Sequence, residues 1–142
     1  MRALVVDDSR AMRTILSRIL RKAGAREIRE AADGQQAIEL LAVGEPPDVA
    51  LVDWNMPNMN GLDLVVALRR KAEWRRIAIV MVTTENEHSQ VVRALAAGAH
   101  EYLIKPFDES ALLEKLAILG FQMPEEPGEP ELADNFAGGT LS

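Results

Sequence analysis

Asp53 has the most suggestive position of any reactive side chain, because it directly follows the apolar run 49–52. A loop rich in Pro, Asn and Gly, residues 55–61, comes after it. A short apolar run bounded by turn residues indicates a buried parallel strand, and open α/β sheets bind ligands at the carboxyl ends of such strands. Asp53 is therefore a candidate reactive group. An Asp in this place could instead cap a helix or accept hydrogen bonds from loop amides.

Polar residues also end three other strand-like segments, and a parallel sheet would bring all of these ends to one edge. They are Asp7 and Asp8 after segment 2–6, Thr83 at the end of 77–83, and Lys105 after 100–104. Each has a simpler interpretation: a solvated helix start beside Ser9, a helix N-cap, or a surface ion pair. Their joint placement at four strand ends favours one shared site.

The chemistry of such a site follows from its charges. Two carboxylates about 5 Å apart repel each other by about 3 kcal/mol at an effective dielectric constant near 20. Oxygen ligands without His or Cys select Mg²⁺, and the Lys105 ammonium is a second positive charge of the kind that binds phosphate. The residues match transfer of a phosphoryl group to a carboxylate, with Asp53 supplying the attacking oxygen.

The chain alternates strand-like and helix-like segments five times. We expect strands at 2–6, 26–31, 49–52, 77–83 and 100–104, and helices between Ser9 and Gly24, between Gly34 and Gly44, from Gly61 through Leu68, over 87–97 and over 108–119. This alternation predicts an α/β fold with a parallel sheet covered on both faces. Segment 26–31 is charged at four of six positions, which indicates an edge strand. We expect Trp74 to pack in the loop after the third helix.

Composition excludes several classes of function. Cysteine is absent from the 142 residues, so disulfides and thiolate metal sites are impossible. This fits a cytoplasmic protein. No apolar run approaches the roughly 20 residues needed to span a bilayer, so we expect no membrane insertion. The net charge of −6 argues against direct binding to DNA.

The charge is concentrated at the C-terminus. Residues 121–142 contain five acids, no Lys or Arg, and several Pro and Gly residues. Their few apolar side chains would not compensate the backbone entropy lost on ordering, so we expect this acidic tail to be disordered. The folded domain is expected to span residues 1–120.

Four sequence blocks, at residues 5–9, 53–61, 82–85 and 102–107, resemble the receiver domain of two-component response regulators. The order and spacing of the blocks agree with that family over residues 1–120, and they are most similar to the single-domain CheY-like chemotaxis regulators. The resemblance implies a doubly wound, flavodoxin-like (βα)5 fold with strand order 2-1-3-4-5. The alternation of segments does not itself determine that order.

The resemblance also implies roles for the residues of the site. Asp53 would be the phosphoacceptor, and Lys105 would contact the phosphoryl group. Mg²⁺ would bind to Asp8, Asp53 and the backbone carbonyl of Asn55, with Asp7 acting mainly through a bound water.

Further residues are implied to switch the protein or to set the lifetime of the phosphorylated form. Thr83 would hydrogen-bond a phosphoryl oxygen, Tyr102 would turn inward behind it, and the peptide bond before Pro106 would be cis. Asn55 and Glu85 would influence dephosphorylation, and this pair resembles the faster-decaying members of the family.

The implied function is a phosphorylation-activated signalling protein rather than an enzyme, with intrinsic self-phosphorylation and self-dephosphorylation chemistry. A sensor histidine kinase would be the phosphodonor. A protein effector would bind residues 87–119, the fourth helix, fifth strand and fifth helix, on a face that includes Val91, Arg93, Ala97 and Tyr102. Chemotaxis is the expected pathway. One alternative is a receiver separated from its output domain. Another is a phosphatase of the haloacid dehalogenase type, which needs an acid where this chain has Ser9.

Overall fold

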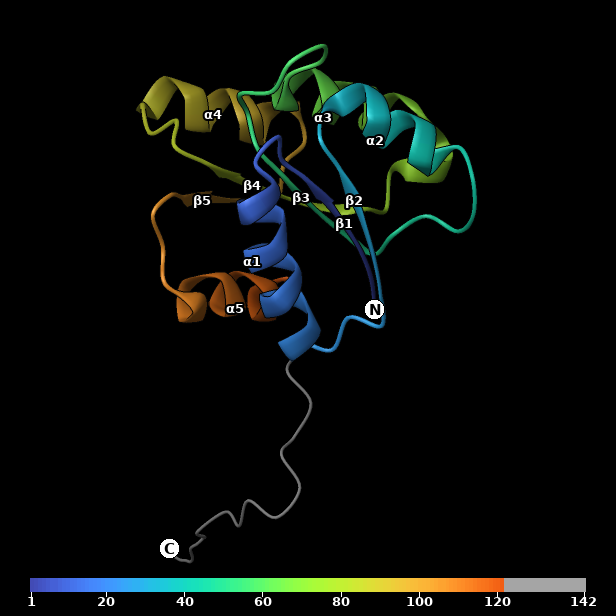
Figure 1. The fold of residues 1–142 in the computed structure, drawn as a ribbon. Helices are drawn as coiled ribbons and strands as arrows, with labels where there is room; N and C mark the ends of the chain where they lie inside the picture. The colour runs from blue at the N-terminus through green and yellow to red at the C-terminus, as the bar shows by residue number, and fades with distance from the viewer. Residues whose placement is uncertain (122–142) are drawn as a thin grey trace, which may run out of the picture.

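Strands and helices alternate along residues 1–121, the part of the chain that the computed structural model describes (Figure 1). The strands are β1 (Arg2–Val6), β2 (Glu27–Ala31), β3 (Val49–Val52), β4 (Ala78–Thr83) and β5 (Glu101–Ile104). The helices are α1 (Arg10–Lys22), α2 (Gly34–Leu41), α3 (Gly61–Arg70), the 3-10 turn η1 (Ala72–Trp74), α4 (His88–Ala97) and α5 (Glu109–Ile118). The predicted elements are confirmed, with small shifts at their ends. The expectation of disorder concerns residues that, apart from Phe121, lie outside the described part.

The five strands form one parallel sheet in the order β2-β1-β3-β4-β5, which confirms the implied doubly wound fold. The charged strand β2 lies at an edge, as its composition predicted. The peptide bond between Lys105 and Pro106 is cis. Among the helices of residues 1–121, none combines the length and apolar character that crossing a membrane requires.

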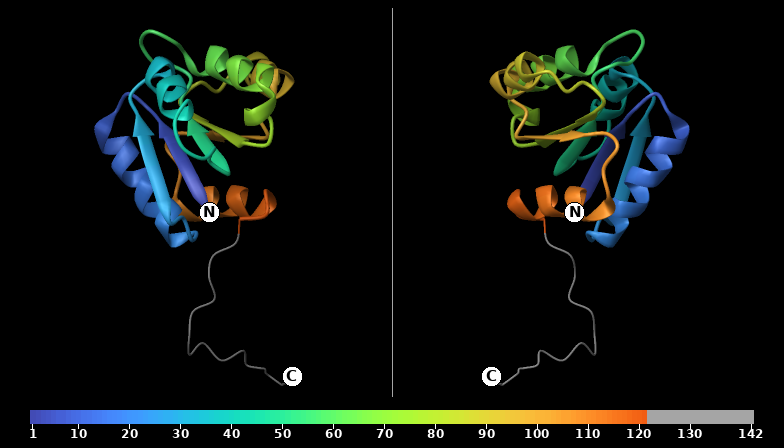
Figure 2. Two further views of the ribbon diagram at one scale, coloured as in Figure 1. Left: turned by 90° about the vertical axis from the view of Figure 1, so that its right-hand side faces the viewer. Right: turned by 90° about the vertical axis from the view of Figure 1, so that its left-hand side faces the viewer.

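Successive residues of the central strands face opposite layers of helices, because side chains alternate along a strand. Leu4, Val52 and Met81 pack with the α2, α3 and α4 layer, which includes Ala37, Leu64 and Ala94. Val5, Leu51 and Val80 pack with the α1 and α5 layer, which includes Leu16 and Leu112. Figures 1 and 2 show these two layers on either side of the sheet. Strands buried on both faces explain the unbroken apolar runs of the sequence.

Strand register determines which polar residues meet at the carboxyl edge of the sheet. Val6 of β1 pairs with Val52 of β3, so Asp7 and Asp53 each follow a paired position. The backbone N–H of Asp53 donates to the Val6 carbonyl over 2.9 Å. A register shift of one residue would turn one of these carboxylates to the opposite face.

Trp74 is buried in η1, as predicted for the loop after α3, with 5% of its surface exposed. Lys71, at the start of this turn, places its ammonium 5.0 Å from the centre of the Trp74 ring. The turn η1 links α3 to β4, and its Trp74 side chain belongs to the core beneath these elements.

His100 connects the start of β4 to the end of α4. Its Nδ1 accepts the Ile79 backbone N–H over 3.1 Å, and the Arg69 guanidinium lies 3.3 Å from the same nitrogen while donating to the Gly98 carbonyl over 2.8 Å. Burial and then the charge of Arg69 lower the pKa of His100 against the opposing charge of Glu101. The neutral ring is the form that accepts these hydrogen bonds.

We expect acid to destabilise the chain through this histidine. Since its pKa in the folded chain lies below the ordinary value of 6.5, the stabilisation is complete above about pH 6.5 and declines as the pH falls toward the folded value. The free energy of unfolding should fall by less than about 1 kcal/mol, because the ring is partly solvated. Urea unfolding at several pH values between 7.5 and 5 measures this change in the free energy of unfolding. His100→Asn keeps an acceptor that does not titrate, and an equal pH dependence in this variant would contradict the assignment.

Candidate functional site

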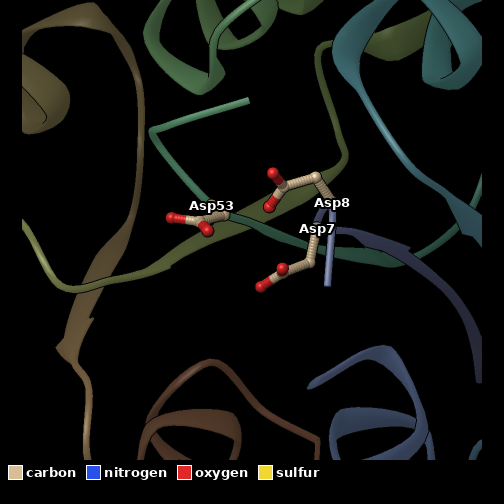
Figure 3. A group of neighbouring side chains, drawn as sticks. All are labelled: Asp7, Asp8 and Asp53. Atoms are coloured by element: carbon tan, nitrogen blue, oxygen red, sulfur yellow. The ribbon is translucent and has the colours of Figure 1, made fainter. Parts of the chain in front are cut away.

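Three carboxylates meet at the carboxyl edge of the sheet, as the sequence predicted (Figure 3). Asp7 and Asp8 follow β1 and Asp53 follows β3, and one carboxylate oxygen of each lies within 4.8 Å of the others. Asp7 and Asp53 are buried, with 1% and 8% of their surface exposed, whereas Asp8 is exposed. The cluster therefore has two carboxylates within the protein and one at its rim.

Lys105 lies between the two buried carboxylates. Its Nζ is 2.8 Å from Asp7 Oδ2 and 3.2 Å from Asp53 Oδ2. Burial alone would lower the pKa of Lys105, but the hydrogen bond to Asp7 and the charges of Asp53 and Asp7 outweigh it, so the pKa is raised. The side chain is thus a fixed cation, and it compensates only one of the three negative charges.

Backbone amides orient the same two carboxylates. Asp7 Oδ1 accepts the N–H of Ser9 over 2.8 Å, and Asp53 Oδ1 accepts the N–H of Trp54 over 2.7 Å. Arg13, which the sequence did not indicate, donates to the backbone carbonyl of Asp7 over 2.7 Å. These contacts place one oxygen of each Asp against an amide and the other toward Lys105.

Gly61 allows the loop after Asp53 to return closely to the strand end. A Cβ at this position would lie 2.0 Å from the carbonyl oxygen of Asp53, so only glycine fits. The Gly61 N–H donates to the Trp54 carbonyl over 2.8 Å and closes the loop of residues 55–60. The sequence showed a turn here without its reason.

The remaining candidates form a second group next to the carboxylates. Thr83 is fully buried, and its hydroxyl accepts the Glu85 N–H over 3.3 Å. The Glu85 carboxylate accepts the side-chain amides of Asn55 and Gln90, and these two hydrogen bonds lower the pKa of Glu85. Tyr102 donates its hydroxyl to the Glu85 carbonyl over 2.7 Å. The contact between Asn55 and Glu85 joins the loops after β3 and β4, which their positions in the sequence did not reveal.

The two groups touch through the backbone. The Lys105 N–H donates to the Thr83 carbonyl over 2.9 Å, because β5 pairs with β4 there. Burial, and then the charges of Glu85 and Asp53, raise the pKa of Tyr102, so its phenol stays protonated and able to donate.

The face of α4, β5 and α5 exposes other apolar residues than expected. Of the residues named for it, Ala97 packs against the core and Arg93 places its guanidinium 5.8 Å from the centre of the Trp54 ring. The large apolar side chains that these three elements expose are Val92, Leu95, Ile104 and Ile118.

The fold and the site define a doubly wound α/β protein whose carboxyl edge holds an acidic cluster with one fixed lysine. Residues 3–117 match the response regulator receiver domain, and the chain belongs to this family. The chain is 43% identical over 119 residues to the chemotaxis protein CheY1 of Helicobacter pylori, which covers 84% of this chain and 96% of that protein. A chemotaxis protein CheY homolog of Campylobacter jejuni is 44% identical over 121 residues, covering 84% and 93%.

Solved structures agree with this membership. The chemotaxis response regulator CheY4 of Vibrio cholerae superposes with a TM-score of 0.76 at 36% identity, over 83% of this chain and 97% of that one. The family match and the similarity to chemotaxis regulators confirm the resemblance that the four sequence blocks indicated, and the structure confirms the fold that it implied.

We expect Asp53→Asn to stabilise the chain in the absence of divalent cations. The substitution removes repulsion from Asp7 and Asp8, and it keeps the stronger contact of Lys105 with Asp7. After subtraction of the lost attraction to Lys105, the free energy of unfolding should rise by about 1 kcal/mol. Urea unfolding in EDTA measures the change. A variant less stable than wild type would show that the cluster is already compensated.

Proposed function

We propose that the chain is a phosphorylation-activated response regulator that accepts a phosphoryl group on Asp53. The observation that supports this most directly is the position of Lys105 Nζ, within 3.2 Å of Asp53 and 2.8 Å of Asp7. A fixed cation beside a strand-end carboxylate can balance charge on a phosphoryl group attached there.

The acidic cluster fits Mg²⁺. Its ligand atoms are all oxygens, and the three negative charges of Asp7, Asp8 and Asp53 exceed the single positive charge of Lys105. Asp8, Asp53 and the backbone carbonyl of Asn55 would hold the ion, with Asp7 acting through water. When bound, Mg²⁺ would neutralise charge on the transferred oxygens.

The residues of the chain then perform the transfer. A carboxylate oxygen of Asp53 attacks phosphorus, and the bond from phosphorus to the donor atom breaks, with its electron pair leaving on the donor. The Trp54 N–H on Oδ1 and the Lys105 ammonium on Oδ2 hold the Asp53 carboxylate in place for the attack. The donor is a phosphohistidine of a sensor kinase. The chain itself is a signalling protein, with self-phosphorylation and self-dephosphorylation as its own chemistry.

Thr83, Glu85 and Tyr102 transmit the modification. The Thr83 hydroxyl, now bonded to the Glu85 N–H, would turn to a phosphoryl oxygen, and Tyr102, now bonded to the Glu85 carbonyl, would follow. The Asn55 and Glu85 pair would set the rate of dephosphorylation, because both side chains lie in the loops that border the acceptor.

The exposed apolar side chains of α4, β5 and α5 would then bind a protein effector in the cytoplasm. Chemotaxis is the pathway that the named relatives support. No direct contact with DNA is part of this function.

Intact mass measurement tests the acceptor directly. After incubation with acetyl phosphate and Mg²⁺, we expect a single phosphoryl adduct that decays with time. No adduct should form when EDTA replaces Mg²⁺. Asp53→Asn should abolish it, because this variant keeps the shape of the site and removes the attacking oxygen.

Absence of an adduct in wild type would refute the proposed function. An adduct that persists in Asp53→Asn would assign the acceptor to another residue, and Asp8→Asn then serves as the next variant.

The switch is tested separately from the transfer. Thr83→Ala should still accept the phosphoryl group on Asp53, while the amide shifts of residues 85–104 on phosphorylation should become much smaller than in wild type. The physical reason is that the buried Thr83 hydroxyl would exchange its hydrogen bond with the Glu85 N–H for one to a phosphoryl oxygen, and so move the loop after β4. Two-dimensional amide NMR with and without a phosphodonor measures this, and Thr84→Ala, at the exposed neighbour, is the control. Equal shifts in Thr83→Ala and wild type would contradict the role.

A further inference from the structure

The loop of residues 55–60, whose first residue is a proposed Mg²⁺ ligand, is bound to the turn between β2 and α2. Asn58 Nδ2 donates to Asp33 Oδ2 over 2.7 Å, and the Gly34 N–H donates to the Met59 carbonyl over 3.2 Å. A Cβ on Gly34 would lie 2.8 Å from Met59 Cγ, so the two segments are in close contact. Nothing in the phosphoacceptor chemistry itself explains this contact.

Asn58 has an unusual backbone as well as this side-chain contact. Its φ of 68° is the one left-handed value among the non-glycine residues of the described chain. Asn tolerates this conformation better than most residues, yet it persists only where surrounding contacts hold it. The side-chain amide therefore fixes the middle of a loop whose backbone is unfavourable by itself.

The surroundings of Asp33 keep its carboxylate oriented and ionised, so that it can accept this hydrogen bond. It is buried with 5% of its surface exposed, and its Oδ1 accepts the Gln36 N–H over 2.8 Å at the start of α2. The hydrogen bond from the Gln36 N–H, and then the one from the Asn58 side chain, lower the pKa of Asp33. The carboxylate stays ionised at neutral pH, where charge-assisted hydrogen bonds are the stronger kind. Both of its oxygens have partners within the protein.

We propose that the hydrogen bond between Asn58 and Asp33 positions the loop 55–60 so that the Asn55 carbonyl faces the acidic cluster, and so sets the affinity for Mg²⁺. This inference rests on the proposed function. The loop is closed at its far end by the Gly61 N–H to the Trp54 carbonyl. The side-chain contact of Asn58 holds its middle, next to the backbone contact of Met59 with Gly34. Asn58 and Asp33 are positioning residues, because neither contacts the reacting atoms.

Mg²⁺ affinity is the property to measure. Asn58→Gly keeps the left-handed backbone accessible and removes the donor, while Asp33→Ser keeps a helix cap and removes the second acceptor. Amide NMR titration with MgCl₂ alone should show a Kd about tenfold higher in each variant, as is typical for residues that orient metal ligands. The double variant should be no weaker than either single one, because both remove the same contact.

An exchanged pair provides the rescue. Asp33→Asn combined with Asn58→Asp reverses donor and acceptor, conserves net charge and retains the α2 cap. Its Kd for Mg²⁺ should return to within about twofold of wild type if the pair acts as a unit. Exchange of the Gly34 amide hydrogen without Mg²⁺ should accelerate in Asn58→Gly and slow again in the exchanged pair.

The phosphorylation rate separates positioning from a general loss of structure. With acetyl phosphate, Asn58→Gly should react slowly at low Mg²⁺ and recover to the wild-type rate at saturating Mg²⁺. A Kd unchanged in Asn58→Gly, or additive effects in the double variant, would overturn the inference alone. Wild type that binds Mg²⁺ but forms no adduct would overturn only the proposed function, and wild type that binds no Mg²⁺ would overturn both.

Discussion

The confinement of like charges at one sheet edge is the constraint on which the structure depends. Asp7 and Asp53 are buried beside each other because β1 and β3 are neighbours in register, and within residues 1–121 Lys105 is the one basic side chain that forms an ion pair with them. Removing either charge from water is costly unless it is paired. The apolar strands hold the carboxylates in place in spite of this cost, since sliding them apart would expose the core that both helix layers cover. Because its negative charge exceeds the positive charge of Lys105, the site would be stabilised by a further cation.

The loops around the cluster are joined to one another rather than to the sheet alone. Asn55 reaches Glu85 across the site, Tyr102 reaches the Glu85 carbonyl, and Asn58 reaches Asp33 on the other side. Loops positioned by a rigid scaffold commonly carry function. Here they form a connected rim, so a change at Asp53 that moves one loop must break or move a hydrogen bond of the next.

Much of the fold and the centre of the site could be predicted from the sequence, because apolar runs ending in polar residues specify strands and their active edge. The strand order came from the resemblance, since alternation alone does not select neighbours. Contacts such as Asn55 with Glu85 escaped prediction because they depend on how loops approach in space. The face of α4 was expected to include Val91 and Ala97, whereas Ala97 packs against the core and Val92 and Leu95 are the large apolar side chains that this helix exposes. The alanines of this helix are compatible with either side, so its sequence specifies the buried stripe weakly.

The charge of the site also limits how a switch can work. A phosphoryl group on Asp53 would add about 1.5 to 2 negative charges and three acceptor oxygens, while Lys105 is the only basic side chain that forms an ion pair with Asp53 in the described chain. Moving a population from mostly inactive to mostly active needs about 5.5 kcal/mol of differential stabilisation, and a hydrogen bond to a charged group contributes about 1.5–3 kcal/mol. Thr83 alone is therefore insufficient. At least one further donor, such as a backbone N–H of the rim loops, must turn toward the new oxygens. The loops of the rim are joined to one another by hydrogen bonds that can exchange partners, so they can rearrange in this way while the sheet stays fixed.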